Sequence, residues 1–229
     1  MAPKGFFVTG TDTGIGKTHV SRLLADCFSG RQATTYMKPV QTGCTRTDTG
    51  EIRAPDYDYV MSGSAQMNGT YEQQVPYCFE PACSPHLAAS LAGNAIDLDL
   101  IKACYEAISD GMQTVIVEGA GGVLVPLSDT VYILDLIMYL QLPVLLITTP
   151  RLGTLNHTFL TLRILQECGA AIAGIIFNNV DNKTPSAIYH DNRRMIRERT
   201  RSVPFLEVPY GNPDQHALKE FCDAIEQRS

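Results

Sequence analysis

The segment from Val8 to Thr18 combines three glycines with a Lys-Thr pair at its end, in the order Val8-Thr-Gly-Thr-Asp-Thr-Gly-Ile-Gly-Lys-Thr18. A glycine-rich backbone turns tightly enough to direct successive amide N–H groups at phosphate oxygens. Lys17 would then neutralise the β- and γ-phosphates of a nucleotide, and the Thr18 hydroxyl would ligate magnesium. The segment therefore predicts a phosphate-binding loop for a nucleoside triphosphate with Mg²⁺.

The spacing inside this loop departs from the usual pattern. Five residues separate Gly10 from Gly16, where four are usual, and Thr11 stands where the pattern has glycine. The alternative is a glycine-rich turn that merely joins a strand to a helix. A strand before the loop, a helix after it and the terminal Lys-Thr pair together favour the nucleotide site.

A second lysine and a carboxylate follow two other apolar runs. Lys38 comes directly after Thr34–Met37, and Glu118 comes directly after Thr114–Val117. Because the carboxyl ends of parallel strands face one crevice, we expect both residues near the phosphate loop. A lysine there can hold an anionic substrate or a transferring phosphoryl group, and the carboxylate matches the second metal-binding motif of phosphate-loop enzymes. The alternatives are a surface lysine and a helix-cap or loop acid.

Other polar residues carry weaker signals. A magnesium–nucleotide site often needs another carboxylate, and residue chemistry alone does not choose among Asp48, Glu51, Asp56 and Asp58. The amides at Gly153–His157 would open a helix and could receive a carboxylate, although ordinary capping by Thr154 or Asn156 is the alternative. Asn178-Asn179 could contact a base edge or form a turn. His86, His157, His190 and His216 show no partner pattern, and we assign them no catalytic role.

These residues require a scaffold of strands and helices. Short β-branched and aromatic runs alternate with segments of helical period, which is typical of a parallel sheet covered by helices on both faces. A chain of 229 residues without an internal linker predicts one α/β domain over residues 1–229. The polar stretch Val40–Val75 predicts a long functional loop with one short helix near Tyr57. The expected strands are Gly5–Thr9, Thr34–Met37, Thr114–Val117, Val144–Thr148, Ile172–Phe177 and Pro204–Val208. The expected helices are Lys17–Ser29, one after Ser84-Pro85 through Leu91, Leu98–Ser109, Asp129–Gln141, Leu155–Cys168, Ala187–Arg199 and Pro213–Gln227.

Composition excludes several classes of partner. The chain has 18 Lys and Arg against 24 Asp and Glu, a net charge of −6, which argues against a broad surface for nucleic acid or anionic membrane. We interpret the arginines of 193–201 as a solvated helix face. Seven scattered cysteines without a CxxC pair are typical of a reducing compartment. The N-terminus has no signal-peptide pattern, and no apolar run is long enough to span a bilayer. We expect a cytoplasmic enzyme.

Together these segments resemble the dethiobiotin synthases, ATP-dependent enzymes of the biotin pathway. The resemblance implies a phosphate-loop NTPase-type parallel sheet of about seven strands and a homodimer. It also implies Mg²⁺-dependent conversion of 7,8-diaminopelargonate, CO₂ (or bicarbonate) and ATP into dethiobiotin, ADP and phosphate, through a carbamate and a carbamic–phosphoric anhydride. The matching segments occur in the family's order over most of the chain: Gly10–Thr18, Lys38–Gly43, Ser84–His86, Val117–Gly122, Pro126–Asp129 and Leu152–His157.

Carried over by position, the resemblance implies that Lys17 and Lys38 stabilise the transferring phosphoryl group and the carbamate. It selects Thr18, Asp56 and Glu118 as magnesium ligands. It implies that Thr13 and Thr42 bind the diamine, and that the substrate's tail carboxylate is received by Gly153, Thr154 and Asn156 from the other subunit. The residues it implies for ATP are Gly14, Ile15, Gly16, Lys17, Thr18, His19, Asp56, Glu118, Gly119, Ala120, Gly121, Asn178, Asn179, Pro209, Tyr210 and Gly211.

Two other functions share this fold class. Amide-forming ligases of the kind acting on cobyrinic acid usually carry a glutamine-hydrolysing domain, for which 229 residues leave no room. Nucleotide switches of the partitioning or septum-positioning type often have a second lysine early in the loop or an amphipathic tail. This loop has Thr11, Asp12 and Thr13 instead, and the tail Lys219–Ser229 is short and acidic. The sequence therefore favours the synthase.

Overall fold

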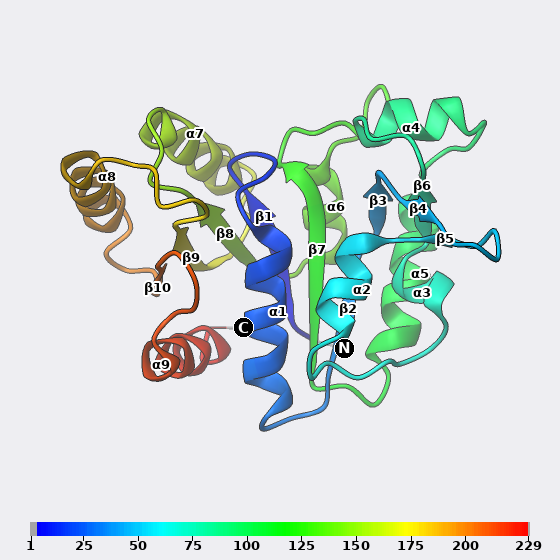
Figure 1. Cartoon of the computed structure of the whole chain (residues 1–229), viewed down its shortest axis with the longest axis horizontal. Helices are drawn as coiled ribbons and strands as arrows, with labels where there is room; N and C mark the ends of the chain where they lie inside the picture. Colours follow the sequence, from blue (N-terminus) through cyan, green and yellow to red (C-terminus); the bar gives the residue numbers. More distant parts are fainter. Residues whose placement is uncertain (1–3, 229) are drawn as a thin grey trace.

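A sheet of six parallel strands forms the centre of the protein, as a computed structural model shows for residues 4–228 (Figure 1). Its strand order is β10-β9-β8-β1-β7-β2, so the first strand lies in the middle, between β7 and β8. Residues 1–3 and 229, at the ends of the predicted domain, lie outside the described part. The strands are β1 (Phe6–Gly10), β2 (Thr34–Met37), β7 (Thr114–Gly122), β8 (Val144–Thr148), β9 (Ile172–Asn178) and β10 (Phe205–Val208).

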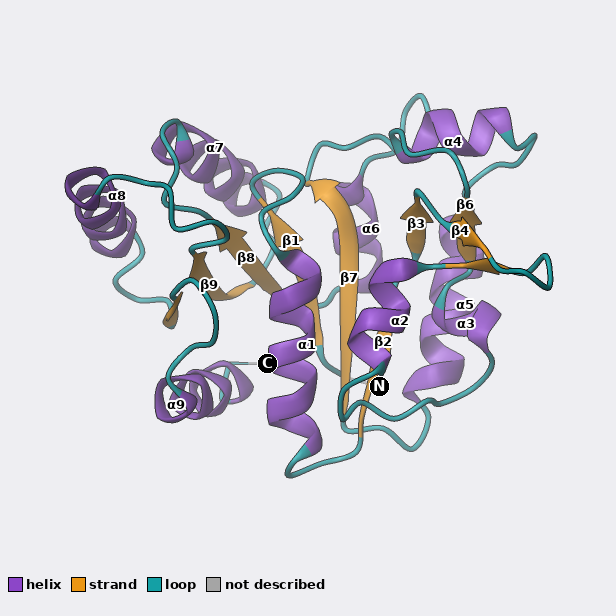
Figure 2. Ribbon diagram, in the orientation of Figure 1, coloured by secondary structure: helices purple, strands orange, loops and turns teal. Residues whose placement is uncertain are grey.

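Helices cover both faces of this sheet (Figure 2). Because side chains alternate along a strand, Phe6 and Val8 of β1 pack on one face with α1 (Lys17–Ser29), α2 (Pro55–Met61) and α9 (Gln215–Glu226), while Phe7 points to the other face. The helices with buried residues on that other side are α4 (Pro85–Leu91), α5 (Leu98–Ser109), α6 (Ile133–Leu140), α7 (Thr154–Glu167) and α8 (Ser186–Arg199). The predicted α/β architecture is confirmed.

The segment predicted as one long loop is more structured than expected. It contains the predicted short helix, α2, and also α3 (Tyr71–Gln74). Its first strand, β3 (Val40–Thr42), pairs in parallel with β6 (Tyr77–Phe79), which follows the predicted loop. Within the loop, β4 (Thr45–Arg46) pairs with β5 (Ile52–Arg53) in antiparallel fashion. These strands form two small separate sheets, so the central sheet has six strands rather than about seven.

The break between β2 and β3 has a local cause. The N–H of Lys38 donates to the carbonyl of Gln74 at 2.8 Å, outside the central sheet. Pro39 has no N–H with which to continue a ladder, and its carbonyl accepts from Tyr77 at 3.2 Å. The chain therefore leaves the sheet at Lys38, which places that lysine at the end of β2.

Most other element bounds agree with the predicted ones. Helices α1 and α5 and strands β2 and β8 have the predicted ends, and α4 ends at the predicted Leu91. Strand β7 continues past its predicted end at Val117 to Gly122, so Glu118 lies within it. The helix expected from Asp129 begins only at Ile133, because Pro126 forms a β-bridge with Tyr132 and the Asp135 carboxylate accepts the N–H of Tyr132 at 2.7 Å as a cap. No helix among residues 4–228 is both long and apolar enough to span a membrane.

Candidate nucleotide site

The phosphate loop joins β1 to α1 at the carboxyl end of the sheet (Figure 1). Two contacts hold it: Thr11 N–H donates to the Ile147 carbonyl at 3.0 Å, and the Asn178 side-chain amide donates to the Ile15 carbonyl at 2.8 Å. Gly16 has φ 84°, the left-handed region, and a Cβ there would lie 2.2 Å from Nδ2 of Asn178. Glycine is therefore required at Gly16 both for backbone conformation and for space.

Lys17 is buried beside this loop, with 7% of its surface exposed. Its Nζ donates to the main-chain carbonyl of Asp12 at 2.8 Å. Burial, followed by the positive charge of Lys38, lowers the pKa of Lys17 to about 8. A negatively charged ligand would reverse this shift, so the side chain is suited to receive phosphate oxygens.

Lys38, Asp56 and Glu118 meet at one point. Lys38 Nζ lies 2.7 Å from Oδ2 of Asp56 and 2.7 Å from Oε1 of Glu118. Burial alone would lower the pKa of Lys38, but the carboxylates of Glu118 and Asp56 outweigh it and raise the pKa. Lys38 therefore remains a cation, as its predicted role requires.

The predicted magnesium ligands converge at the same place. The Thr18 hydroxyl donates to Oε1 of Glu118 at 2.9 Å, the oxygen that also contacts Lys38. No group of three or more His, Cys, Asp or Glu side chains in the described chain is arranged to hold a metal. One hydroxyl and two carboxylates nevertheless fit Mg²⁺ bound with a nucleotide, because that ion takes much of its oxygen shell from phosphates and water.

Residue chemistry alone did not choose between Asp56 and Asp58 as a metal ligand, and the structure places the two carboxylates differently. Asp56 lies at Lys38, whereas Asp58 pairs with Arg53 at 2.6 Å near the surface. Both acids lie on α2, two residues apart, and therefore on different faces of that helix. Only Asp56 is in position to act at the phosphate loop.

A cavity of about 530 Å³ joins these groups. The predicted diamine residues Thr13 and Thr42 line it together with both lysines, and Gly14, Ala120 and Gly121 also contribute. Val40, Gln41 and Val180 line it as well, although the sequence analysis assigned them no role. Val40 and Gln41 lie inside Lys38–Gly43, a segment that resembles the family, so the sequence did contain a signal for them. Val180 lies in no such segment.

The residues predicted to surround the base lie at the ends of two neighbouring strands. Asn178 of β9 pairs with Val208 of β10, and Asn179 N–H donates to the Val208 carbonyl at 2.9 Å. Pro209, Tyr210 and Gly211 follow directly, with Tyr210 exposed. These residues lie at the same sheet edge as the phosphate loop, but they are not among the described residues lining the cavity. The amide of Asn178 is committed to the loop.

Three further predicted ATP residues contribute through their main chain or lie beside the site. Ile15 is buried, and its side chain packs under Gly10. A Cβ at Gly119 would lie 2.9 Å from the Phe7 ring, so its backbone approaches the core closely. His19 faces outward, with Nδ1 3.3 Å from the Tyr59 hydroxyl.

The predicted tail-carboxylate residues begin α7, away from the cavity. Thr154 is buried, and its hydroxyl pairs with Thr148 at 2.8 Å. The Thr154 side chain therefore serves the interior, and only the main-chain groups of Thr154 could meet a ligand. Gly153 and Asn156 are exposed and are not among the described residues lining the cavity.

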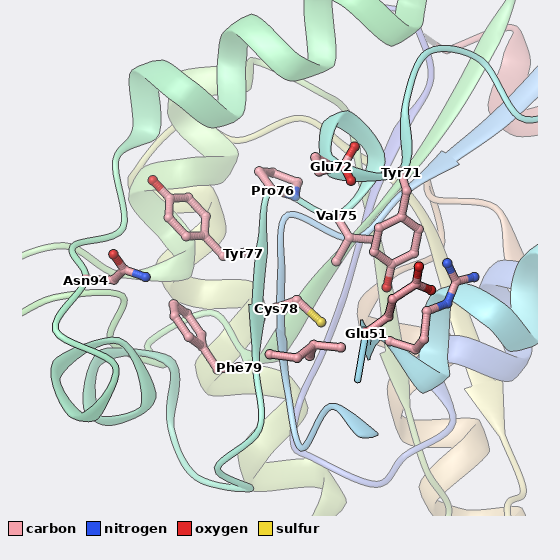
Figure 3. A pocket seen from close by; sticks show the side chains of 11 residues that line it. Glu51, Tyr71, Glu72, Val75, Pro76, Tyr77, Cys78, Phe79 and Asn94 are labelled. Atoms are coloured by element: carbon pink, nitrogen blue, oxygen red, sulfur yellow. The ribbon is translucent and has the colours of Figure 1, made fainter. Parts of the chain in front are cut away.

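A second cavity, of about 470 Å³, lies beside β6 (Figure 3). Alternation along this strand puts Tyr77 and Phe79 on one side and Cys78 on the other. Glu51, Tyr71 and Asn94 complete its edge. Apart from Glu51, which residue chemistry left among several acids, it contains no predicted site residue, so the phosphate-loop cavity is the candidate active site.

Comparisons with known proteins agree with this geometry. A family model described as an AAA domain matches residues 4–213. The ATP-dependent dethiobiotin synthetase BioD of Fusobacterium nucleatum subsp. nucleatum is 40% identical over 216 residues, covering 93% of this chain and 95% of the relative. The protein of the same name from Bacillus subtilis is 36% identical over 208 residues, covering 90% and 86%. The chain belongs to the dethiobiotin synthetase family.

Several solved structures are similar to this chain in fold rather than in sequence. A ParA family ATPase from Chlorobium tepidum matches with a TM-score of 0.54 at 14% identity, over 99% of this chain and 92% of that one. The cell division ATPase MinD of Pyrococcus furiosus matches with a TM-score of 0.54 at 14% identity, over 98% and 99%. At this identity the likeness shows the fold alone. The partitioning-type switch is thus a distant fold relative, while the dethiobiotin synthetases are relatives in sequence over nearly the whole chain.

Proposed function

We propose that this chain is an ATP-dependent dethiobiotin synthetase, which carboxylates 7,8-diaminopelargonate and closes the cyclic urea of dethiobiotin with release of ADP and phosphate. One observation carries the proposal beyond family membership. A phosphate loop, two buried lysines and two carboxylates share a cavity with Thr13 and Thr42. Such a cavity can hold a triphosphate and an anionic carbamate next to each other.

The proposed reaction begins with a carbamate, formed when one substrate amine attacks CO₂ and loses a proton. A carbamate oxygen attacks the γ-phosphorus, and the bond to the β-phosphate oxygen breaks to release ADP. The second amine then attacks the carbamate carbon, gives up a proton and expels phosphate, which closes the urea. Lys38 and Lys17 stabilise the negative charge that gathers around the transferring group in these steps.

Magnesium is part of the proposal. Thr18, Asp56 and Glu118 would hold it, and it would neutralise charge on the β- and γ-phosphates. The support is that the Thr18 hydroxyl donates to Glu118, while the carboxylates of Glu118 and Asp56 both contact Lys38. Positioning and fixed charge then account for most of the catalysis, because phosphoryl transfer needs little covalent help from the protein.

Substrate and nucleotide recognition complete the proposed site. Thr13 and Thr42 would bind the diamine, with phosphate oxygens held by the loop amides of Gly14–Thr18. Asn179 and the Pro209–Gly211 turn would surround the base, and Asn178 would serve by holding the loop. We also propose a cytoplasmic location, since free thiols such as those of this chain are typical of a reducing compartment.

The proposed active form is a homodimer. Gly153, Thr154 and Asn156 lie at the start of α7, with Gly153 and Asn156 exposed. The main-chain amides there can receive the tail carboxylate of a diamine bound in the partner subunit's cavity. Mixing two inactive variants tests this arrangement. Lys38→Ala damages the cavity, and Asn156→Asp damages the tail site. A mixed dimer therefore has one active site in which an intact cavity from one subunit meets an intact tail site from the other. Recovery of activity on mixing supports the shared site, and no recovery contradicts it.

The function itself is tested by measuring phosphate release from ATP. We expect release to require both 7,8-diaminopelargonate and bicarbonate, and to yield dethiobiotin detected by mass spectrometry. Hydrolysis stimulated by DNA or lipid vesicles but not by the diamine would instead indicate a switch. Stimulation by glutamine or ammonia would indicate an amide-forming ligase.

A further inference from the structure

Tyr36 contacts the oxygen of Glu118 that faces away from Lys38. The Tyr36 hydroxyl donates to Oε2 of Glu118 at 2.9 Å, whereas Oε1 accepts from Thr18 and Lys38. The side chains of Tyr36 and Glu118 are both fully buried. The Tyr36 phenol is therefore a hydrogen-bond donor to this carboxylate.

The ring of Tyr36 is itself held in place. Nε2 of Gln74, which is fully buried, donates to the Tyr36 carbonyl at 3.1 Å and to the Thr35 hydroxyl at 2.8 Å. Oε1 of Gln74 accepts from the Tyr57 hydroxyl at 2.5 Å. The Tyr57 ring packs on Tyr36 with centroids 6.2 Å apart. The Tyr36 hydroxyl thus has little freedom to leave the carboxylate.

This arrangement constrains Glu118 from both sides. A carboxylate with only one bonded oxygen can rotate about its terminal torsion, which is broad. With Oε2 fixed by Tyr36, Oε1 stays toward Thr18 and the cavity. Hydrogen bonds from outer residues to metal-binding carboxylates orient them in this way, and their loss typically lowers metal affinity or activity about 10- to 100-fold.

We infer that Tyr36 is a positioning residue for the magnesium–nucleotide site, acting through its hydrogen bond to Glu118. The inference rests on the proposed role of Glu118 as a metal ligand. Tyr36 touches neither nucleotide nor diamine in this assignment. Its effect must therefore appear in metal binding and must depend on the presence of the Glu118 carboxylate.

The first experiment measures Mn²⁺ binding by electron paramagnetic resonance, with a non-hydrolysable ATP analogue present. We expect Tyr36→Phe, which removes only the hydroxyl, to weaken Mn²⁺ affinity about tenfold. The matched control is Tyr105→Phe. Tyr105 is also buried, but among residues 4–228 its hydroxyl bonds to the main chain of Lys4, at 2.9 and 3.0 Å, and to no carboxylate. That control should bind Mn²⁺ normally; a comparable loss in both variants would overturn the inference.

A double-mutant cycle separates positioning from packing. Glu118→Gln should weaken Mn²⁺ binding, and adding Tyr36→Phe in that background should cause no further loss, because the two act as one unit. Equal losses from Tyr36→Phe in both backgrounds would overturn the inference. So would normal binding by Tyr36→Phe alone, and that result would leave the function intact. Normal binding by Glu118→Gln would remove the metal assignment and the inference together.

A third variant separates the hydroxyl of Tyr36 from the buried network around it. Tyr57→Phe keeps both rings and the Tyr36 hydroxyl and removes only the bond to Gln74. We expect it to bind Mn²⁺ as the wild type does. A tenfold loss would assign the effect to the buried network rather than to the hydroxyl of Tyr36, and would overturn the inference.

Discussion

The side-chain amide of Asn178 donates to the main-chain carbonyl of Ile15 at 2.8 Å and lies where a Cβ on Gly16 would fall. The last residue of β9 thus holds the middle of the phosphate loop, 163 residues earlier in the chain. Asn178 is almost fully buried. This contact makes the shape of the loop depend on a distant strand as well as on its own glycines.

Gly16→Ala should abolish ATP binding, because it combines backbone strain with a clash against Asn178. Gly14→Ala is the matched control, since Gly14 also has positive φ but a Cβ there meets nothing within 4 Å. The strain at either position is about 1–2 kcal/mol. We expect Gly14→Ala to weaken ATP binding by roughly tenfold in calorimetry, with a much larger loss for Gly16→Ala. Adding Asn178→Ala to Gly16→Ala should recover part of the affinity, and equal losses from the two alanines would contradict the clash.

ATP binding should take up protons near pH 8. The pKa of Lys17 is lowered to about 8 by burial and by Lys38, and triphosphate charge raises it again. Affinity should therefore fall as the pH rises above 8. Calorimetry at pH 8 in two buffers of different ionisation enthalpy measures the uptake, and Lys17→Met should lack this component. Identical heats in both buffers would count against a lowered pKa of Lys17 in the free protein.

The same shift predicts the pH dependence of stability. Between pH 8 and 10.5 the unfolded chain binds more protons at Lys17 than the folded chain does. The free energy of unfolding, measured relative to Lys17→Met, should therefore rise with pH over that window. Urea titrations of both proteins at several pH values check the sign. A falling difference would show that Lys17 is not desolvated in the folded state.

Lys38→Met should destabilise the protein by about 3–5 kcal/mol, the usual cost of leaving a buried charge without its partner. Glu118 is fully buried and would lose its nearest cation. The variant Lys38→Met/Glu118→Gln removes the uncompensated charge and should regain most of the stability in urea unfolding. Both variants should lack synthetase activity. If the double variant is no more stable than the single one, the ion pair is not the cause.

Asp56→Asn and Asp58→Asn form a matched pair on one helix. We expect Asp56→Asn to raise the Mg²⁺ concentration for half-maximal activity by at least about tenfold. Asp58 pairs with Arg53 at a partly exposed site, so Asp58→Asn should cost no more than about 1 kcal/mol of stability and leave the Mg²⁺ dependence unchanged. The reverse ranking would assign the metal to Asp58.

The sequence predicted which residues meet in the site better than it predicted the contacts between their side chains. Lys38 and Glu118 could be placed together because both follow apolar runs in the sequence, and parallel strands end at one edge. The role of Tyr36 could not be predicted in this way. Its hydroxyl reaches Glu118 only because Tyr36 is opposite Ile116 in the β2–β7 register, and register depends on tertiary packing.

Short elements were missed for a related reason. β6 has three residues and α3 has four, too few for a periodic signal. Each is stabilised from outside: Tyr77 pairs with Val40, and Gln74 accepts the N–H of Lys38. These tertiary contacts give structure to a segment whose polar composition is typical of a loop.

The central position of β1 has a consequence for how the protein is made. Phe6 lies opposite Ile116 of β7 and Phe7 opposite Val144 of β8, so β1 leaves the ribosome before either of its neighbours has been translated. Asn178, which braces the glycine loop, is synthesised later still. Nucleotide therefore cannot assist the nascent chain early in biogenesis, and the growing polypeptide must remain unaggregated until its own later strands reach β1.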